Sequence, residues 1–310
     1  MKISVIGAGN VGATLAMRIA ENDLADVVLL DIAEGICSGK AMDLTDAAPV
    51  INHDRKIIPT TNYKDIEGSK IVVITAGFPR MPGMNREELL LKNSSIVKEA
   101  AGNIKKFCPE AIIIVVTNPL DAMTYLAFKE SGFPKNRVLG MAGVLDTSRF
   151  TALVAGELNV RHRDIETYMI GSHGDTMVPL ISHTKVKGEP ISNVLSSEKI
   201  EEVVKRTRAR GAEIVGALKA GSAYYAPSAS TFSMVEAILK DTKRTLCVSC
   251  FLDGEYGLKD ICIGVPAKLG KNGIEKVIDL KLTEKEAQEF KNSAEVIRKT
   301  TTKLKELCSK

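Results

Sequence analysis

His173 is the strongest candidate for acid–base chemistry in this sequence. It is one of four histidines, and its neighbours Ser172 and Gly174 are small enough to leave an imidazole accessible. Imidazole titrates near neutral pH, so it can accept or return a proton under physiological conditions. A carboxylate on the ring would fix its tautomer and stabilise the imidazolium, and Asp146 and Asp175 both qualify by type. The sequence does not choose between them, and a histidine in a purely structural turn is the alternative interpretation.

A loop with two arginines could bind an anionic substrate. It covers Ala76–Glu87, and its two glycines and two prolines indicate a long loop. Arg80 and Arg86 lie on it, six positions apart. Because the loop follows the apolar run Ile71–Thr75, we place it at the carboxyl edge of a sheet, where α/β proteins bind ligands and where long loops often act as lids. Arginines on a loop are otherwise simply solvated.

Asn118 is expected at the same edge. It lies in Thr117-Asn118-Pro119, directly after the apolar run Ile112–Val116. A contact with a ligand and a cap on the following helix are both compatible with this position. The local sequence leaves the two roles open.

The segment Gly7-Ala8-Gly9-Asn10-Val11-Gly12 matches G-x-G-x-x-G, the phosphate-binding pattern of dinucleotide sites. It follows an apolar run and opens a helical stretch, which is the context that the pattern requires. Gly7 would permit the tight turn, Gly9 the approach of a pyrophosphate, and Gly12 the close packing of helix on strand. Free N–H groups at the helix N-terminus would bind the phosphates.

Asp31 indicates which dinucleotide binds. It ends the next apolar run, 19 residues after Gly12, where an acidic side chain accepts hydrogen bonds from the ribose hydroxyls. Its charge would repel a ribose 2′-phosphate, which favours NAD over NADP. An FAD or S-adenosylmethionine pocket shares parts of this pattern.

The elements that must position these residues alternate in the first half of the chain. Short runs rich in Val and Ile are apolar on both faces, as in buried parallel strands. They fall at Ile3–Ile6, Val27–Leu30, Ile71–Thr75 and Ile112–Val116. Helical patterns lie between them at Val11–Ala20, about Gly39–Leu44 and Glu87–Lys106. This alternation predicts an α/β fold with a doubly wound parallel (Rossmann) sheet.

The second half has a different pattern, which predicts an α+β domain with antiparallel strands. A strand at Ile165–Ile170 precedes three helical stretches, at Ile200–Lys219, Thr231–Leu239 and Glu284–Leu307. Two apolar segments around an Asp-Gly turn indicate a hairpin, Leu246–Leu252 with Ile261–Val265. We place the boundary near residue 145, so that residues 1–145 bind the nucleotide and residues 146–310 bind the substrate and carry out the chemistry.

Composition excludes several classes of protein. The chain has 310 residues, a formal charge of +4 and six cysteines, which argues against a nucleic-acid partner and a disulfide scaffold. No apolar run is long enough to span a membrane. Since the first apolar run begins at Ile3, we expect no signal peptide and a cytoplasmic location. Cys247 and Cys250 form C-x-x-C, but no second pair completes a zinc site, so we predict no metal and assign both to strand packing.

Taken together, these motifs show that the chain resembles the lactate/malate dehydrogenase family along almost its whole length, and most closely the malate-oxidising, lactate-dehydrogenase-like subgroup. The markers are the glycine loop, the Gly77–Glu87 loop, Thr117-Asn118-Pro119-Leu120-Asp121, the segment from Gly140 to Asp146, and Gly171–Pro179. The resemblance implies reversible oxidation of (S)-malate to oxaloacetate with NAD. It also implies a homo-oligomer, a tetramer rather than a dimer.

The resemblance also implies a role for each site residue. His173 accepts the hydroxyl proton, Asp146 pairs with it, and Arg86 polarises the C2 carbonyl. Arg149 binds the C1 carboxylate. Asn118 contacts the substrate, and the cofactor contacts are Gly7, Ala8, Gly9, Asn10, Val11, Gly12, Asp31, Asn93, Val116, Thr117 and Asn118.

Arg80 decides the substrate within the family, where this position carries Gln in lactate dehydrogenases and Arg in malate dehydrogenases. Oxaloacetate has a second carboxylate where pyruvate has a methyl group, and a closed loop would leave that carboxylate unpaired without a cation. Loss of the partner of a buried charge costs on the order of 2–5 kcal/mol. The alternatives are a lactate or broad 2-hydroxyacid dehydrogenase and, in another class, a catalytically silent dinucleotide-binding protein.

Overall fold

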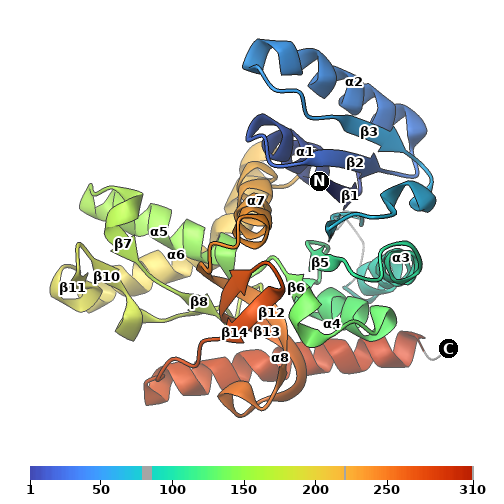
Figure 1. Ribbon diagram of the computed structural model, residues 1–310. Helices are drawn as coiled ribbons and strands as arrows, with labels where there is room; N and C mark the ends of the chain where they lie inside the picture. Colours follow the sequence, from blue (N-terminus) through green and yellow to red (C-terminus); the bar gives the residue numbers. More distant parts are fainter. Residues whose placement is uncertain (79–85, 220, 309–310) are drawn as a thin grey trace.

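The computed structural model describes residues 1–78, 86–219 and 221–308. Its centre is a single sheet with the strand order β14-β13-β12-β6-β5-β4-β1-β2-β3, which helices cover on both faces (Figure 1). The six strands of the first half pair in parallel in the order 3-2-1-4-5-6, which is the doubly wound dinucleotide-binding topology. They are β1 Lys2–Ile6, β2 Asp26–Leu30, β3 Ile57–Thr60, β4 Ile71–Ile74, β5 Ile112–Val115 and β6 Val138–Gly140.

Four helices connect these strands, and hydrophobic burial fixes which face each covers. They are α1 Asn10–Glu21, α2 Glu34–Ile51, α3 Arg86–Phe107 and α4 Leu120–Ser131. Apolar residues of α1 and α2 join one core cluster and those of α3 and α4 join another. Since successive strand residues point to opposite faces, β1 contributes Val5 to the first cluster and Ile6 to the second.

The second half supplies both more of the sheet and a separate lobe. Its helices are α5 Gly143–Leu158, α6 Ser197–Leu218, α7 Tyr225–Leu239 and α8 Glu284–Cys308. Strands β12 Thr245–Asp253, β13 Lys259–Gly270 and β14 Gly273–Val277 extend the central sheet antiparallel to β6. Small antiparallel sheets form from β7 Ile165–Glu166, β10 Lys185–Val186 and β11 Glu189–Pro190, and from β8 Met169–Ile170 and β9 Val178–Pro179.

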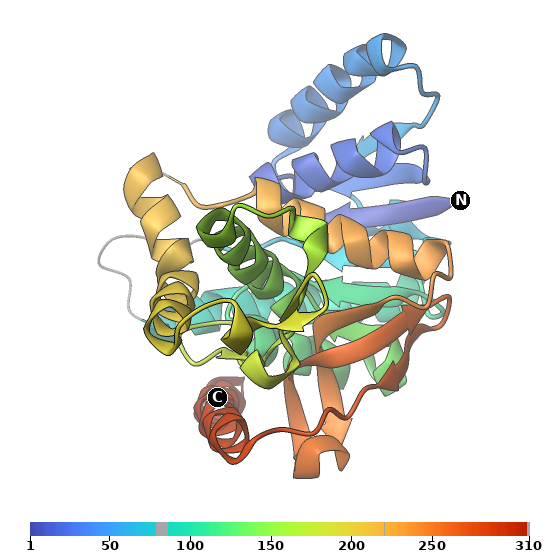
Figure 2. The same cartoon turned by 90° about the vertical axis from the view of Figure 1, so that its left-hand side faces the viewer.

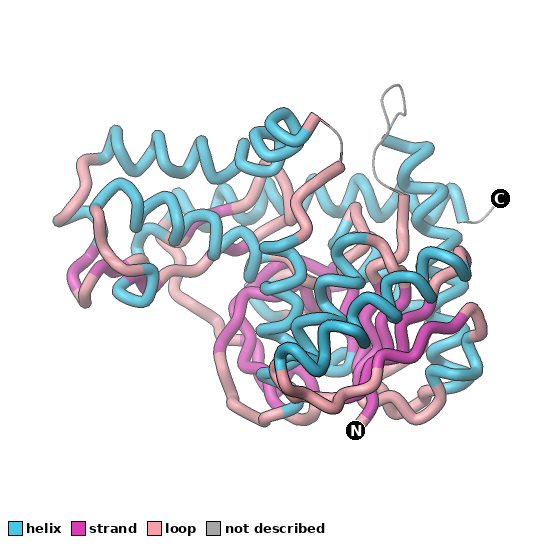
Figure 3. Tube along the Cα trace, turned by 90° about the horizontal axis from the view of Figure 1, so that it is seen from above, coloured by secondary structure: helices cyan, strands magenta, loops and turns pink. Residues whose placement is uncertain are grey.

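Helices of the second half also cover the first. Helix α7 packs beside α1, and α8 packs against α3, α4 and β13. In the turned view the C-terminal helix lies at the opposite end of the molecule from α2 (Figure 2). The view from above shows helices on both sides of the strands (Figure 3). The predicted fold class is confirmed, but the antiparallel hairpin continues the nucleotide-binding sheet rather than standing apart from it.

Several predicted elements were too short. Helix α2 extends well beyond the predicted Gly39–Leu44, because only Cys37 and Ala41 of it are buried and a helix without a regular apolar stripe gives little periodic signal. Strand β13 runs beyond Val265 through Pro266, which pairs with Cys247. No helix in the described part of the chain is long and apolar enough to cross a membrane.

Candidate active site

The glycine loop connects β1 to α1 in a conformation that two of its glycines make possible. Gly7 has a φ of +105°, which is strained for residues with a side chain. A Cβ at Gly12 would collide with the carbonyl oxygen of Gly7, so this glycine lets the helix begin directly against the loop. Both positions are therefore explained by folding alone.

Gly9 has no such explanation in the protein itself. Its φ is −62°, which any residue adopts, and a Cβ there would meet no atom within 4 Å. The open space lies at the N-terminus of α1, whose first N–H groups have no partner within the helix. A Cβ would fill this cradle, so the residues present fit the pyrophosphate of a dinucleotide.

Asp31 and Lys40 hold the same residue of the loop from two sides. The Asp31 Oδ2 atom accepts a hydrogen bond from the Ala8 N–H at 2.6 Å, while its Oδ1 accepts one from the Ala33 N–H at 2.9 Å. The Lys40 Nζ atom donates to the Ala8 carbonyl at 2.8 Å. Asp31 thus anchors the loop as well as standing where a ribose is expected. Lys40 was not singled out from the sequence, because only the fold brings α2 over the loop.

Asn93 lies where it can hold two loops together. It is 1% exposed, its Oδ1 atom accepts the Phe78 N–H at 2.7 Å, and its Nδ2 atom donates to the Asn118 carbonyl at 2.7 Å. The Thr117 hydroxyl donates to the Ala76 carbonyl at 2.6 Å. The loops after β4 and β5 are thereby connected at the carboxyl edge of the sheet, where the Asn118 residue is exposed and Val116 is buried.

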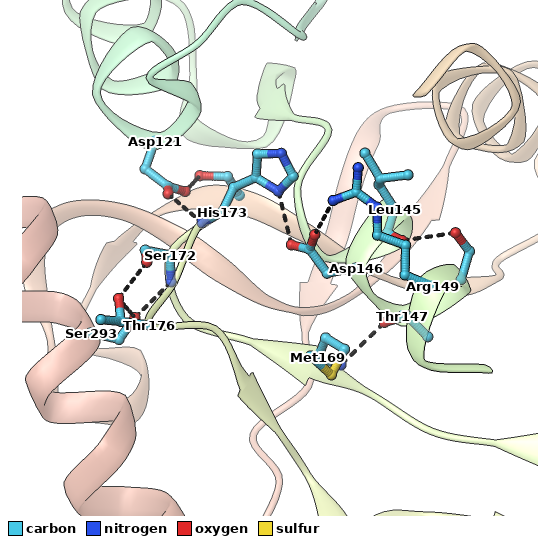
Figure 4. A network of polar contacts seen from close by, with 12 residues as sticks. Asp121, Leu145, Asp146, Thr147, Arg149, Met169, Ser172, His173, Thr176 and Ser293 are labelled. Carbon is cyan, nitrogen blue, oxygen red and sulfur yellow. Dashed lines mark hydrogen bonds and ion pairs between the residues drawn. The ribbon is translucent and has the colours of Figure 1, made fainter. Parts of the chain in front are cut away.

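His173 and Asp146 form a hydrogen-bonded pair (Figure 4). The ring Nδ1 atom lies 2.8 Å from Asp146 Oδ2, and the two side chains are 14% and 2% exposed. Asp146 is in the first turn of α5, whereas Asp175 is exposed to solvent. Of the two carboxylates that the sequence left open, the fold therefore brings Asp146 to the ring. With Nδ1–H donated to Asp146, the neutral ring keeps Nε2 free to accept a proton.

Arg149 lies one helical turn after Asp146 and next to it. Its Nη1 atom is 3.6 Å from Asp146 Oδ1, and within the described residues neither that oxygen nor Arg149 Nε has a hydrogen-bond partner. Burial, followed by the charge of Arg210, lowers the pKa of Arg149 against the opposing effect of Asp146. A largely buried guanidinium whose Nε–H has no partner among the described residues fits an anionic ligand, which would neutralise its charge.

Carboxylates raise the pKa of His173 above 6.5. Burial alone would lower it, but the charge and hydrogen bond of Asp146 together with the charge of Asp121 outweigh burial and the repulsion from Arg149. The ring therefore holds its proton to a higher pH than a free imidazole does. A reaction that needs the neutral ring slows below this pKa, and one that needs the imidazolium slows above it.

Three elements far apart in the sequence hold the backbone that carries His173. Gly171 forms a two-way backbone bridge with Gly264 of β13. The Ser172 N–H donates to the Ser293 hydroxyl of α8 at 2.8 Å. The His173 N–H donates to Asp121 Oδ2 of α4 at 2.9 Å. Sequence reasoning gave Asp121 and Ser293 no role, because only these long-range contacts reveal one.

Two predicted substrate residues are not placed by the structure. Arg80 lies outside the described residues. Arg86 is the first residue of α3, but its side chain is not among those that the structure describes. Among the described side chains, no group of three or more His, Cys, Asp or Glu residues comes together as a metal site. Cys247 and Cys250 are buried on β12, and burial raises the pKa of each thiol to about 12.

A dinucleotide-binding sheet joined to a hydrogen-bonded histidine–aspartate pair and an arginine with an unpartnered Nε–H is the arrangement expected of a nicotinamide-dependent dehydrogenase. Residues 1–140 match the NAD-binding domain of lactate/malate dehydrogenase, and residues 143–308 match the α/β C-terminal domain of the same family. The chain belongs to the lactate/malate dehydrogenase family.

Individual relatives cover nearly the full length. A malate dehydrogenase of Trichormus variabilis is 54% identical over 96% of this chain and 92% of its own. The solved malate dehydrogenase of Salinibacter ruber is 46% identical with a TM-score of 0.95, covering 100% of this chain and 99% of that one. A lactate dehydrogenase of Cryptosporidium parvum, solved with lactic acid and nicotinamide adenine dinucleotide, is 43% identical with a TM-score of 0.95 over 98% of both chains.

Proposed function

We propose that the chain is an NAD-dependent malate dehydrogenase that catalyses (S)-malate + NAD⁺ ⇌ oxaloacetate + NADH + H⁺. The observation that carries this proposal is the His173–Asp146–Arg149 cluster in a family member whose glycine loop leaves room for a pyrophosphate. The similar malate dehydrogenases support this substrate. Bound NAD supplies the hydride acceptor in one direction and its reduced form supplies the hydride in the other.

In this proposal each side chain of the cluster has one task. His173 Nε2 accepts the C2 hydroxyl proton during oxidation and returns it during reduction. Asp146 holds the ring through Nδ1 and stabilises the imidazolium. Arg149 binds the C1 carboxylate through a two-pronged ion pair, and its Nε–H has no partner among the described residues. Asn118 contacts the substrate.

Arg80 and Arg86, the first residue of α3, complete the site in this proposal. Arg86 polarises the C2 carbonyl and stabilises charge that develops there in the transition state. Arg80 pairs with the second carboxylate of oxaloacetate or malate, which pyruvate and lactate lack. The selectivity for a dicarboxylate is therefore assigned to Arg80.

The cofactor contacts are assigned to the edge formed by β1, β2 and β5. The segment Gly7-Ala8-Gly9-Asn10-Val11-Gly12 would hold the pyrophosphate, and Asp31 the adenosine ribose, where its charge disfavours a 2′-phosphate. Residues 116–118 would line the nicotinamide. We retain Asn93 as a cofactor contact, supported by its position between the loops that carry residues 78 and 118.

Initial rates of NADH oxidation with oxaloacetate and with pyruvate, measured side by side, test the function. We expect a strong preference for oxaloacetate, and an Arg80→Gln variant should lose most of it, by tens- to thousands-fold. Equal or faster turnover of pyruvate would overturn the assignment of Arg80 and leave a lactate or broad 2-hydroxyacid dehydrogenase. The similar lactate dehydrogenase makes that the second candidate. Binding of NADH without turnover of either substrate would indicate a silent dinucleotide-binding protein.

We propose a homo-oligomer, a tetramer rather than a dimer, in which α2 supplies part of the interface, because Ile36, Met42 and Val50 of this helix are all more than half exposed. We place the enzyme in the cytoplasm, supported by its six free cysteines. We retain a division near residue 145 into a cofactor-binding and a substrate-binding part.

A further inference from the structure

A second carboxylate, Asp121, lies behind the acid–base pair. It is in the first turn of α4 and almost fully buried. Its Oδ2 atom accepts the backbone N–H of His173 at 2.9 Å, and its Oδ1 atom accepts the Ser249 hydroxyl at 2.7 Å. Asp146 binds the same histidine through the ring, so His173 is held by one carboxylate at its backbone and by another at its side chain (Figure 4).

We propose that Asp121 is a positioning residue that uses its negative charge, and not only its hydrogen bonds, to keep the His173 imidazolium stable during turnover. The inference rests on the proposed function of His173 as the acid–base group. Asp121 does not touch the ring nitrogen that would meet the substrate, and therefore acts through His173. Its two hydrogen bonds fix the loop, and its charge shifts the proton equilibrium of the ring.

The charges around His173 support a role for the charge of Asp121 that is separate from the role of its hydrogen bonds. Asp146 and Arg149 of α5 act on the ring with opposite signs, and Asp121 of α4 adds a second negative charge. Burial raises the pKa of Asp121 to about 6 although its hydrogen bonds from Ser249 and His173 lower it. The carboxylate is therefore ionised above pH 6, in the range where His173 titrates.

Two charged side chains act on Asp121 itself: the charge of His173 lowers its pKa and that of Asp146 on α5 raises it. Strands β12 and β13 contribute the thiols of Cys250 and Cys262, and burial raises the pKa of each far above neutral. Helix α8 contributes the uncharged Ser293 to the loop. Among the described residues, His173 is thus the cation that the negative charge of Asp121 stabilises.

An amide would satisfy the same hydrogen bonds without the charge. In Asp121→Asn, the side-chain oxygen can accept the His173 N–H, and the NH₂ group can donate to the Ser249 hydroxyl, which is free to rotate. A residue needed only to hold the loop could therefore be an asparagine. Asp121→Asn isolates the charge, and Asp121→Ala removes the hydrogen bonds as well.

The test measures the pKa of His173 in two ways. Diethyl pyrocarbonate acylates neutral imidazole, so the pH dependence of His173 acylation, obtained by subtracting a His173→Asn variant, reports the pKa without any substrate. The pH profile of kcat/KM for malate oxidation reports it during turnover. In Asp121→Asn we expect both values to fall by about 0.5 pH unit or more, so that oxidation persists to lower pH and oxaloacetate reduction fails at lower pH.

Two further variants make the result decisive. Glu286→Gln removes another buried carboxylate, whose bonds go to Ser182 and Thr283, and should leave both pH curves unmoved. Ser249→Ala keeps the Asp121 carboxylate but removes a donor, so it should shift His173 in the same direction by less, and it tests the proposal if Asp121→Asn does not fold.

The outcomes separate this inference from the proposed function. A lower rate in Asp121→Asn with unchanged pKa values of His173 in both assays would overturn the role of the charge. A shifted acylation curve in a protein that turns over no 2-oxo acid would support the inference and overturn the malate dehydrogenase assignment.

Discussion

At the scale of single residues, the buried carboxylate of Asp121 should cost stability. The carboxyl ionises from about pH 3.8 in the unfolded chain but only near pH 6 in the folded protein. A raised folded pKa stabilises the fold when the group is protonated, so this contribution is lost as the pH rises from 3.8 to 6. The difference of about two pH units corresponds to about 3 kcal/mol.

Asp121→Asn should therefore be more stable than the unaltered protein at pH 8, by up to about 3 kcal/mol. The two proteins should approach each other at pH 4, where the native carboxyl is protonated. Urea unfolding at both pH values measures this difference. At each pH, the free energy of unfolding of Asp121→Asn is compared with that of the unaltered protein. A smaller gain at pH 8 than at pH 4 would contradict the prediction.

Residue types predicted part of the site. His173 was identifiable from its small neighbours, and Asp146 was one of two candidates for its partner. Asp121 was not identifiable, because its role depends on contacts with residues 52 and 128 positions away. The same holds for Lys40, whose only signal is a bond across the fold to Ala8.

At the scale of elements, the glycine loop separates a folding role from a binding role. Gly9→Ala meets no protein atom, so we expect normal stability and a KM for NADH raised about tenfold or more, equivalent to about 1.4 kcal/mol of lost binding. Gly12→Ala collides with the Gly7 carbonyl, so we expect it to lose about 1–3 kcal/mol of folding stability.

The two variants control for each other. Urea unfolding and NADH titration of both proteins distinguish the roles. Normal cofactor affinity in a folded Gly9→Ala variant would remove the argument that a pyrophosphate fills the space at this glycine.

Element type was predictable where periodicity was strong. The four predicted strands of the first half correspond to β1, β2, β4 and β5. Strands β3 and β6 were missed, because four and three residues carry almost no alternating pattern. Helix α7 begins before the predicted Thr231, since Pro227 lies in its first turn, where proline removes no hydrogen bond of the helix.

At the scale of the whole molecule, the exposed apolar face of α2 predicts association. Val50 is 87% exposed, and in the proposed oligomer it is covered. Val50→Glu should raise the dissociation constant about 100-fold, equivalent to about 2.7 kcal/mol. Analytical ultracentrifugation over a range of concentrations measures this change. Val296→Glu, on an exposed position of α8, is the matched control, and equal dissociation of both variants would argue against an interface at α2.

The overall arrangement of the two halves was only partly predictable. The change in the pattern of strands and helices predicts a boundary near residue 145, which stays a prediction, and the hairpin around Gly254 was visible in its turn residues. Its attachment to β6 was not visible, because pairing between strands leaves no local signal in either strand. The structure joins them through Gly140 with Ser249 and Leu139 with Cys250.

This pairing has a consequence for the protein during its synthesis. A ribosome releases β6 more than 100 residues before the strand that covers its open edge, so the nascent nucleotide-binding half carries an unpaired strand for much of translation. Helix α8, which shields α3 and α4, arrives last of all. A chain interrupted in between would therefore present the unpaired edge of β6, where edge-to-edge aggregation can begin.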